Sequence, residues 1–189
     1  PLRVAVHSRG GVLGAEQLLL LTESEQSFTL PLVGSDPVVS INRGFTAPIV
    51  IERDLAREDL VFLAAHDDDP FARSEALQEL AVGHLVATAS GTLSADEQAA
   101  GEAAIIGAFR SSLDDNALED AMRGELMVLP SETYLFEAMA KGERLADPGA
   151  IHAAREGLKA AIGTALAGEL AALHARASAV AHDDPGGRG

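Results

Sequence analysis

The residue types that most often carry enzymatic chemistry are present in this sequence, but not at the spacings that chemistry needs. A catalytic zinc helix would place two histidines one helical turn apart, with a glutamate after the first. No histidine here is followed by glutamate, and no two are three or four residues apart; the six are His7, His66, His84, His152, His174 and His182. The chain has no cysteine. We therefore predict no catalytic residue and no metal ligand in it, and we assign no residue to substrate binding.

The densest polar cluster is His66-Asp67-Asp68-Asp69, directly before Pro70. One interpretation is a divalent-cation site, which would make the chain an acidic metal-dependent hydrolase. A dedicated calcium loop, however, spaces its acids at alternate positions around a glycine, and this cluster does not. We favour a helix end followed by a new helix, with Asp69 as the N-cap and Pro70 in the first turn.

Arg43 and Phe45 form a second candidate pair, on either side of Gly44. They could bind a ligand together. More often such a pair packs a corner between domains, with the arginine bonded to main-chain or side-chain oxygens. We favour the packing interpretation.

The first part of the chain has the alternating pattern of β-strands. Five short strands are predicted, over residues 2–7, Gln17–Thr22, Phe28–Val33, Val38–Asn42 and Ile49–Glu52. Gly34–Pro37 reads as a turn, and Pro31 favours an edge or a bulge. The pattern predicts an antiparallel, immunoglobulin-like β-sandwich over residues 1–54, which lacks its first strands.

After Asp54 the apolar residues follow helical periodicity, and start signals recur. Capping residues are predicted at Asp69, at Ser94 with Glu97, at Asn116 with Glu119, at Ser131 and at Asp147. About six helices result, the longest running from Pro148 past Leu173, and the tail His182–Gly189 reads as a loop. Short connections favour helical hairpins, so residues 55–189 are predicted to be the start of an ARM- or HEAT-like superhelix. The fold class is thus α+β in two segments.

The net charge of −15 is unevenly distributed. Residues 1–53 contain five acids and four bases, which leaves −14 for the remainder of the chain. A negative field of this size repels phosphate backbones, so we predict no nucleic-acid partner. No apolar run approaches the roughly 20 residues that span a membrane, and we predict no membrane partner.

Several segments together resemble the bacterial aminopeptidase N family of zinc metallopeptidases. Ser40–Pro48 is similar to that family's R-x-F-S-A-P segment, and Phe62–Arg73 is similar to the helix pair that follows it. Leu129–Glu132 and the helix beginning at Asp147-Pro148 continue the resemblance in the same order. The one visible departure is Ser74, where the family usually has tryptophan.

The resemblance implies that this chain is a non-catalytic C-terminal portion of a cytoplasmic aminopeptidase. The zinc, which would activate a water for attack on the first peptide bond, and its ligands would lie in an upstream catalytic domain, so this chain would hold no cofactor and would be inactive alone. Its partners would be that domain and the remaining helices of the same chain, with peptides as the parent's substrate. Packing between the two segments would involve Arg43, Phe45, Asp69 and Arg73. A free-standing binding or scaffold module is the alternative.

Overall fold

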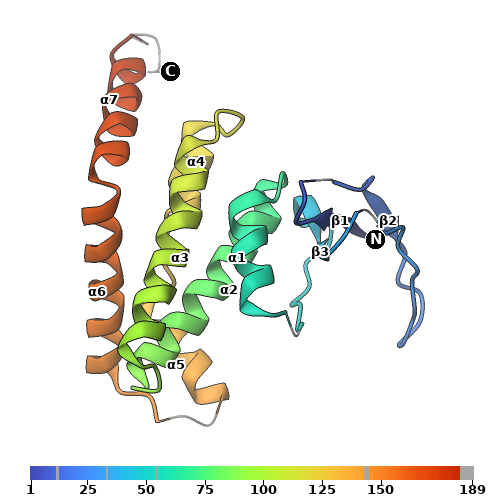
Figure 1. Cartoon of the computed structure of the whole chain (residues 1–189), viewed down its shortest axis with the longest axis horizontal. Coiled ribbons are helices and arrows are strands. Elements are labelled where there is room, and N and C mark those ends of the chain that lie inside the picture. Colours follow the sequence, from blue (N-terminus) through green and yellow to red (C-terminus); the bar gives the residue numbers. More distant parts are fainter. Residues whose placement is uncertain (12, 33, 54, 143–144, 184–189) are drawn as a thin grey trace, which may run out of the picture. The chain divides into compact units, whose positions relative to one another are not determined.

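The computed structural model describes residues 1–11, 13–32, 34–53, 55–142 and 145–183, which form two compact units (Figure 1). The first unit is Pro1–Leu80 and the second is Ala81–Gly189. The described residues contain one small antiparallel sheet followed by seven α-helices. This order confirms the predicted fold class. The predicted changeover residue Asp54 and the strand residue Val33 lie outside the described residues.

The sheet has β1 (Leu2–Ser8) at its centre, with β2 (Gln17–Leu19) on one side and β3 (Pro37–Ile41) on the other. Both pairings are antiparallel, and His7 lies opposite Val38 while Ala5 lies opposite Ser40. Because side chains alternate between faces, His7 and Ser40 share one face of the sheet. All four of these residues are buried, and α1 contacts β3.

Two of the five predicted strands are wrong, and a third is shorter than predicted. Residues 28–32 and 49–52 form no strand, and Gln17–Thr22 is paired only as far as Leu19. Pro31 has no N–H to donate to a ladder, which weakens any strand there. Leu32 and Val50 are 76% and 92% exposed. Alternating hydrophobicity marks segments able to pair, but within the described residues these two segments meet no strand edge.

The helices begin close to most of the predicted start signals. Their bounds are α1 Arg57–His66, α2 Pro70–Ala89, α3 Ala95–Asp114, α4 Asp120–Leu126, α5 Glu132–Lys141, α6 Pro148–Ala165 and α7 Ala167–Asp183. Ser94 and Glu97 form the predicted reciprocal capping box at α3. Ser131 accepts a hydrogen bond from Tyr134 N, and Asp147 accepts one from Gly149 N.

Three helical predictions are corrected by the structure. Asn116 does not cap α4, which instead begins after Glu119 with no side-chain cap bond. The turn before it is closed by Asp115, whose Oδ1 accepts from Ala117 N at 2.9 Å. The long predicted helix is divided at Leu166 (φ −114°, ψ 17°) into α6 and α7. Thr164 Oγ1 donates to Ala160 O, a bond that commonly bends helices.

The third correction concerns the predicted C-terminal loop. His182 and Asp183 belong to α7, and residues 184–189 lie outside the described residues.

The second unit is built around α3, which contacts α4, α6 and α7, while α5 contacts α6. Ile105 and Phe109 of α3, Leu158 of α6 and Leu166 are each at most 2% exposed. The apolar stripes predicted on these helices therefore form the core of the unit. No helix among the described residues has the length and apolar character to cross a membrane.

Candidate functional site: the Arg43 cluster

The turn after β3 places Arg43 against the start of the helices. Asn42 adopts a left-handed conformation (φ 58°), which asparagine tolerates better than most residues. Its side-chain Nδ2 donates to Ala47 O at 3.0 Å, and its Oδ1 accepts from Ala47 N at 2.9 Å. Gly44 also has a positive φ, of 63°. These bonds close the Asn42–Ala47 turn and fix the backbone from which Arg43 projects.

Arg43 is only 5% exposed, and its guanidinium is shared among three carboxylates. Nη1 donates to Asp67 Oδ1 at 2.8 Å, Nη2 to Asp68 Oδ1 at 2.6 Å, and Nε to Glu16 Oε2 at 3.1 Å. Charge-assisted bonds of this kind are shorter and stronger than neutral ones. We call these residues, together with His7 and Ser40, the Arg43 cluster.

The two sheet residues of the cluster complete the surroundings of Arg43 Nη1. Ser40 Oγ accepts from Nη1 at 3.3 Å, and His7 Nε2 lies 3.3 Å from the same nitrogen. His7 Nε2 is also 3.4 Å from Asp67 Oδ1. The cluster thus joins the buried face of the sheet to the turn between α1 and α2 in one polar network.

Asp67 is the most deeply buried member of the cluster, with an exposure of 0%. Besides Arg43, its Oδ1 accepts from Asp69 N at 2.9 Å. Its Oδ2 is buried and has no hydrogen-bond partner among the described residues. A buried carboxylate is costly unless an opposite charge compensates it, so Asp67 depends on Arg43.

The pKa of the Asp67 carboxyl reflects two opposing effects. Burial acts to raise it, but the interactions with His7 and Ser40, the Asp69 N–H and the charge of Arg43 together outweigh burial, and the pKa lies below its ordinary value of 3.8. For Arg43, burial acts to lower the pKa, but the bond to Asp68 and the other carboxylates raise it above its ordinary value. Both groups are therefore charged at neutral pH.

The other three residues singled out in the sequence lie beside this cluster. Arg73, also 5% exposed, donates from Nε and Nη2 to the carbonyl oxygen of Asp67 at 2.9 and 2.7 Å. Asp69 Oδ1 accepts from Ala72 N at 2.8 Å, the bond expected of an N-cap for α2. The ring centroids of Phe45 and Phe71 are 4.9 Å apart. The structure thus brings the four predicted residues to one junction.

The possible cation ligands are not the ones that the sequence grouped together. Among the described residues, the group whose ligand atoms lie within 4.8 Å of one another is His7, Asp67 and Asp68. His66 does not join it; its ring lies 5.2 Å from that of Phe62. Arg43 already supplies the positive charge between the two carboxylates, and a metal ion there would be repelled by the guanidinium. These residues therefore do not fit a zinc ion.

Sequence reasoning missed His7, Glu16 and Ser40. Alternation placed His7 and Ser40 in strands, but only the register of β1 against β3 shows that they share a face. Glu16 precedes β2 and reaches Arg43 because β2 pairs with β1. The one available signal was the polar pair His7 and Ser8, which directly follows the apolar residues Val4, Ala5 and Val6 at the end of the strand.

A hollow of about 320 Å³ in the second unit is a weaker candidate for a functional site than the Arg43 cluster. It is lined by His84 and Thr88 of α2, Gln98 and Glu102 of α3, and small residues of α6. Gln98 Nε2 donates to Glu102 Oε1 at 3.1 Å, so these two polar groups are already paired with each other. We assign no chemistry to this hollow.

Stability against acid should depend on Asp67. Because the pKa of Asp67 is lower in the folded state than its ordinary value of 3.8, ionisation of Asp67 stabilises the fold. This contribution to the free energy of unfolding is fully present above pH 3.8 and is lost as the pH falls through the folded-state pKa. The difference in free energy of unfolding between the wild type and Asp67→Asn should therefore be largest near neutral pH and shrink below pH 3.8. Urea titrations across this range measure it. Asp114→Asn, an exposed change on α3, controls for the loss of one negative charge. A difference that does not vary with pH would contradict the prediction.

Comparison with known families identifies both parts of the chain. Residues 57–188 match a domain of unknown function described as ARM repeats (DUF3458_C), and residues 1–54 match the associated DUF3458 domain, described as an Ig-like fold. The chain belongs to this family, which pairs an immunoglobulin-like domain with helical repeats. These descriptions confirm the predicted Ig-like and ARM-like architecture.

Two curated relatives are named aminopeptidase N, the family that the sequence resembles. Aminopeptidase N of Caulobacter vibrioides is 35% identical over 168 residues, which is 87% of this chain and 18% of that protein. Aminopeptidase N of Escherichia coli is 29% identical over 162 residues, 83% of this chain and 18% of that protein. The resemblance to aminopeptidase N is thereby confirmed. The chain spans less than a fifth of the length of these relatives.

A solved structure shows the same fold. Legionella pneumophila aminopeptidase A, in complex with aspartic acid, superposes with a TM-score of 0.71 at 23% identity. The match covers 92% of this chain and 19% of that one. The arrangement of sheet and helices described above therefore occurs within a much longer protein.

Proposed function

We propose that this chain is the non-catalytic C-terminal portion of a zinc-dependent aminopeptidase that removes N-terminal residues from peptides. The observation that carries the proposal is the extent of the match: 87% of the chain aligns with an aminopeptidase N of which it covers only 18%. The remaining four-fifths of such a parent would contain the catalytic domain. Among the described residues, the group of possible cation ligands formed by His7, Asp67 and Asp68 surrounds the Arg43 guanidinium, and the proposal places the zinc in the upstream domain.

In this proposal the chain supports and covers the active site of the upstream domain. Such a cover restricts access to short or unfolded peptides and excludes water from the reaction. The parent acts in the cytoplasm in peptide catabolism, and the absence of cysteine in this part of it suits a reducing compartment. The helical segment that forms this cover has to be held at a fixed angle to the Ig-like segment, because misplacement of a binding surface by about 1 Å can lower the reaction rate by two orders of magnitude.

The Arg43 cluster is the part of the chain that would fix this angle. It connects strands of the Ig-like segment with the first residues of the helical segment through bonds of 2.6–3.3 Å around one buried guanidinium. Arg73, Asp69 and the Phe45–Phe71 contact brace the same turn. We assign these residues to interdomain packing rather than to chemistry.

The test compares the fragment with its parent on an alanine-arylamide substrate in the presence of zinc. The 189-residue chain should release no product above the blank, and the parent should release it. In the parent, Arg43→Ala should lower kcat/KM by about 10- to 100-fold, while Arg57→Ala, an exposed arginine at the start of α1, should leave it unchanged. Hydrolysis by the fragment alone, or a parent without aminopeptidase activity, would overturn the proposal.

A further inference from the structure

Arg9 follows β1 directly and lies outside the Arg43 cluster. It stands in a tight turn in which Gly11 N donates to Ser8 O at 2.8 Å. Ser8 is 2% exposed, and its hydroxyl donates to Ser35 O at 2.7 Å. The turn is therefore anchored at the buried end of the strand, which fixes the backbone from which the Arg9 side chain projects.

The Arg9 side chain reaches the first turns of α1. Nη1 donates to Glu58 O at 3.2 Å, and Nη2 donates to Asp59 Oδ1. The guanidinium carbon lies 5.6 Å from the centroid of the Phe62 ring, which is within the range of a cation–π interaction. Residues three positions apart are neighbours on a helix surface, so Asp59 and Phe62 present one surface to Arg9.

The same guanidinium also holds the residue that precedes β3. Arg9 Nε lies 2.8 Å from Asp36 Oδ2, and Arg9 N donates to Asp36 O at 3.4 Å. Asp36 has a positive φ of 55°, in a region that residues other than glycine seldom occupy. Arg9 thus connects the end of β1, the start of β3 and the start of α1.

Arg9 and the Arg43 cluster hold α1 at its two ends. In the first turn of the helix, Asp59 is bonded to Arg9. Directly after the helix, Asp67 is bonded to Arg43. Eight residues at 1.5 Å per residue place these two attachments about 12 Å apart. Burial of the apolar side chains of α1 is non-directional, and a helix attached at one end can turn about that point. A second attachment fixes its direction.

We propose that Arg9 is a positioning residue that sets the direction of α1 against the sheet and, in the parent, keeps the cover in its productive orientation. The second part rests on the proposed function. The Arg9 side chain is 31% exposed and that of Asp36 is 68% exposed, so solvent screens this pair and its loss destabilises the fold little. An effect on direction with little effect on stability distinguishes Arg9 from the buried Arg43.

The distance between two spin labels on the 189-residue chain tests the direction of α1. The sequence has no cysteine, so Leu18→Cys on β2 and Arg57→Cys at the start of α1 supply the two attachment points, both of them exposed. Arg9→Ala in this background should broaden the distance distribution at least about twofold, because an attachment at one end leaves rotation free. The urea midpoint should stay close to that of the labelled chain with Arg9.

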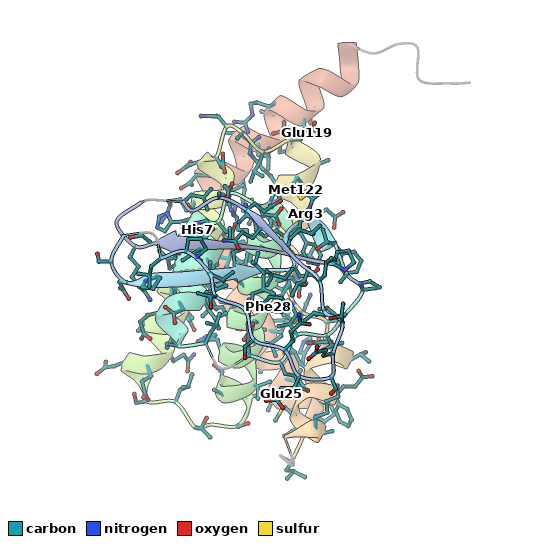
Figure 2. The ribbon with its side chains drawn as sticks, turned by 90° about the vertical axis from the view of Figure 1, so that its right-hand side faces the viewer. Arg3, His7, Glu25, Phe28, Glu119 and Met122 are labelled. Atoms are coloured by element: carbon teal, nitrogen blue, oxygen red, sulfur yellow. The ribbon has the colours of Figure 1, made fainter. Side chains whose placement is uncertain are left out.

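Arg3→Ala is the matched control. Arg3 is exposed and lies on β1 with His7, toward the other end of the strand (Figure 2). Its carboxylate partner is Glu16, at 3.6 Å, and not a residue of α1. This variant loses the same charge and should keep the narrow distribution. Asp59→Ala leaves the turn after β1 intact and should broaden the distribution as Arg9→Ala does.

An unchanged distribution in Arg9→Ala and Asp59→Ala would overturn the proposal. If the urea midpoint fell at the same time, Arg9 would be a stabilising residue without a positioning role. In the parent, Arg9→Ala should lower kcat/KM for the alanine-arylamide about 10-fold, and Arg3→Ala should leave it unchanged. A broadened distribution with wild-type kinetics would contradict the covering role in the proposed function and leave the positioning of α1 by Arg9 in place.

Discussion

Replacing Arg43 by alanine is expected to lower the free energy of unfolding by about 3–5 kcal/mol, because it leaves a buried carboxylate without its counter-charge. Asp67 is 0% exposed and its Oδ2 already lacks a partner among the described residues. Truncation of Arg43 removes the Nη1 bond to the Oδ1 of this fully buried group. The cost is therefore that of a broken buried ion pair, and not the small cost of a surface one.

Urea unfolding followed by circular dichroism measures this loss. Arg43→Lys should recover only part of it, since an ammonium group cannot bond Asp67, Asp68 and Glu16 with the fork geometry of guanidinium. Asp68→Asn is the matched control, because it breaks an ion pair of the same guanidinium that is exposed to solvent. The Asp68 side chain is 53% exposed, so solvent screens this pair. It should cost less than about 1 kcal/mol. Equal losses for Arg43→Ala and Asp68→Asn would show that burial does not set the energetics of the cluster.

The sequence predicted the helical half of this fold well because its start signals are local. The capping box at Ser94 and the caps at Ser131 and Asp147 each depend on residues within three positions, and all three occur in the structure. The strands depend on partners. Residues 28–32 and 49–52 have suitable alternation, but they stay unpaired because pairing requires another edge at the right place. The division of the last long helix at Leu166 was missed for another reason: the Thr164 Oγ1–Ala160 O bond, of a kind that bends helices, leaves no mark on the apolar periodicity.

The candidate site was predictable only in part, for the same reason. Arg43, Phe45, Asp69 and Arg73 were recognisable from their segments, and the structure brings them together where the Asn42–Ala47 turn meets the start of α2. The sequence could not show that Asp67 and Asp68 form hydrogen bonds with Arg43, because they lie 24 and 25 positions from it along the chain. His7 is more distant still, at 36 positions from Arg43. Only the register of β1 against β3 brings it there.

Replacing both Arg43 and Asp67 by apolar residues should be much less harmful than the sum of the single changes. Arg43→Met leaves the buried Asp67 carboxylate unpaired, and Asp67→Val leaves the buried guanidinium with only its bonds to Asp68 and Glu16, whereas the double variant leaves neither charge buried. The backbone of Asp67 is extended (φ −63°, ψ 132°), a conformation that β-branched valine accepts. The Asp69 N–H loses its acceptor in the double variant, so recovery should be incomplete.

A double-mutant cycle in urea measures the coupling, which we expect to be about 2–3 kcal/mol, at the upper end for residues in one network. Arg110 and Glu169, whose side chains are 3.0 Å apart and 44% and 34% exposed, provide the matched control pair and should couple by less than about 1 kcal/mol. Additive losses for Arg43 and Asp67 would mean that each contributes through packing alone. Strong coupling would establish the buried pair as a unit that holds the sheet to the first helices through charge, and would explain why the Asp67 carboxylate depends on the presence of Arg43.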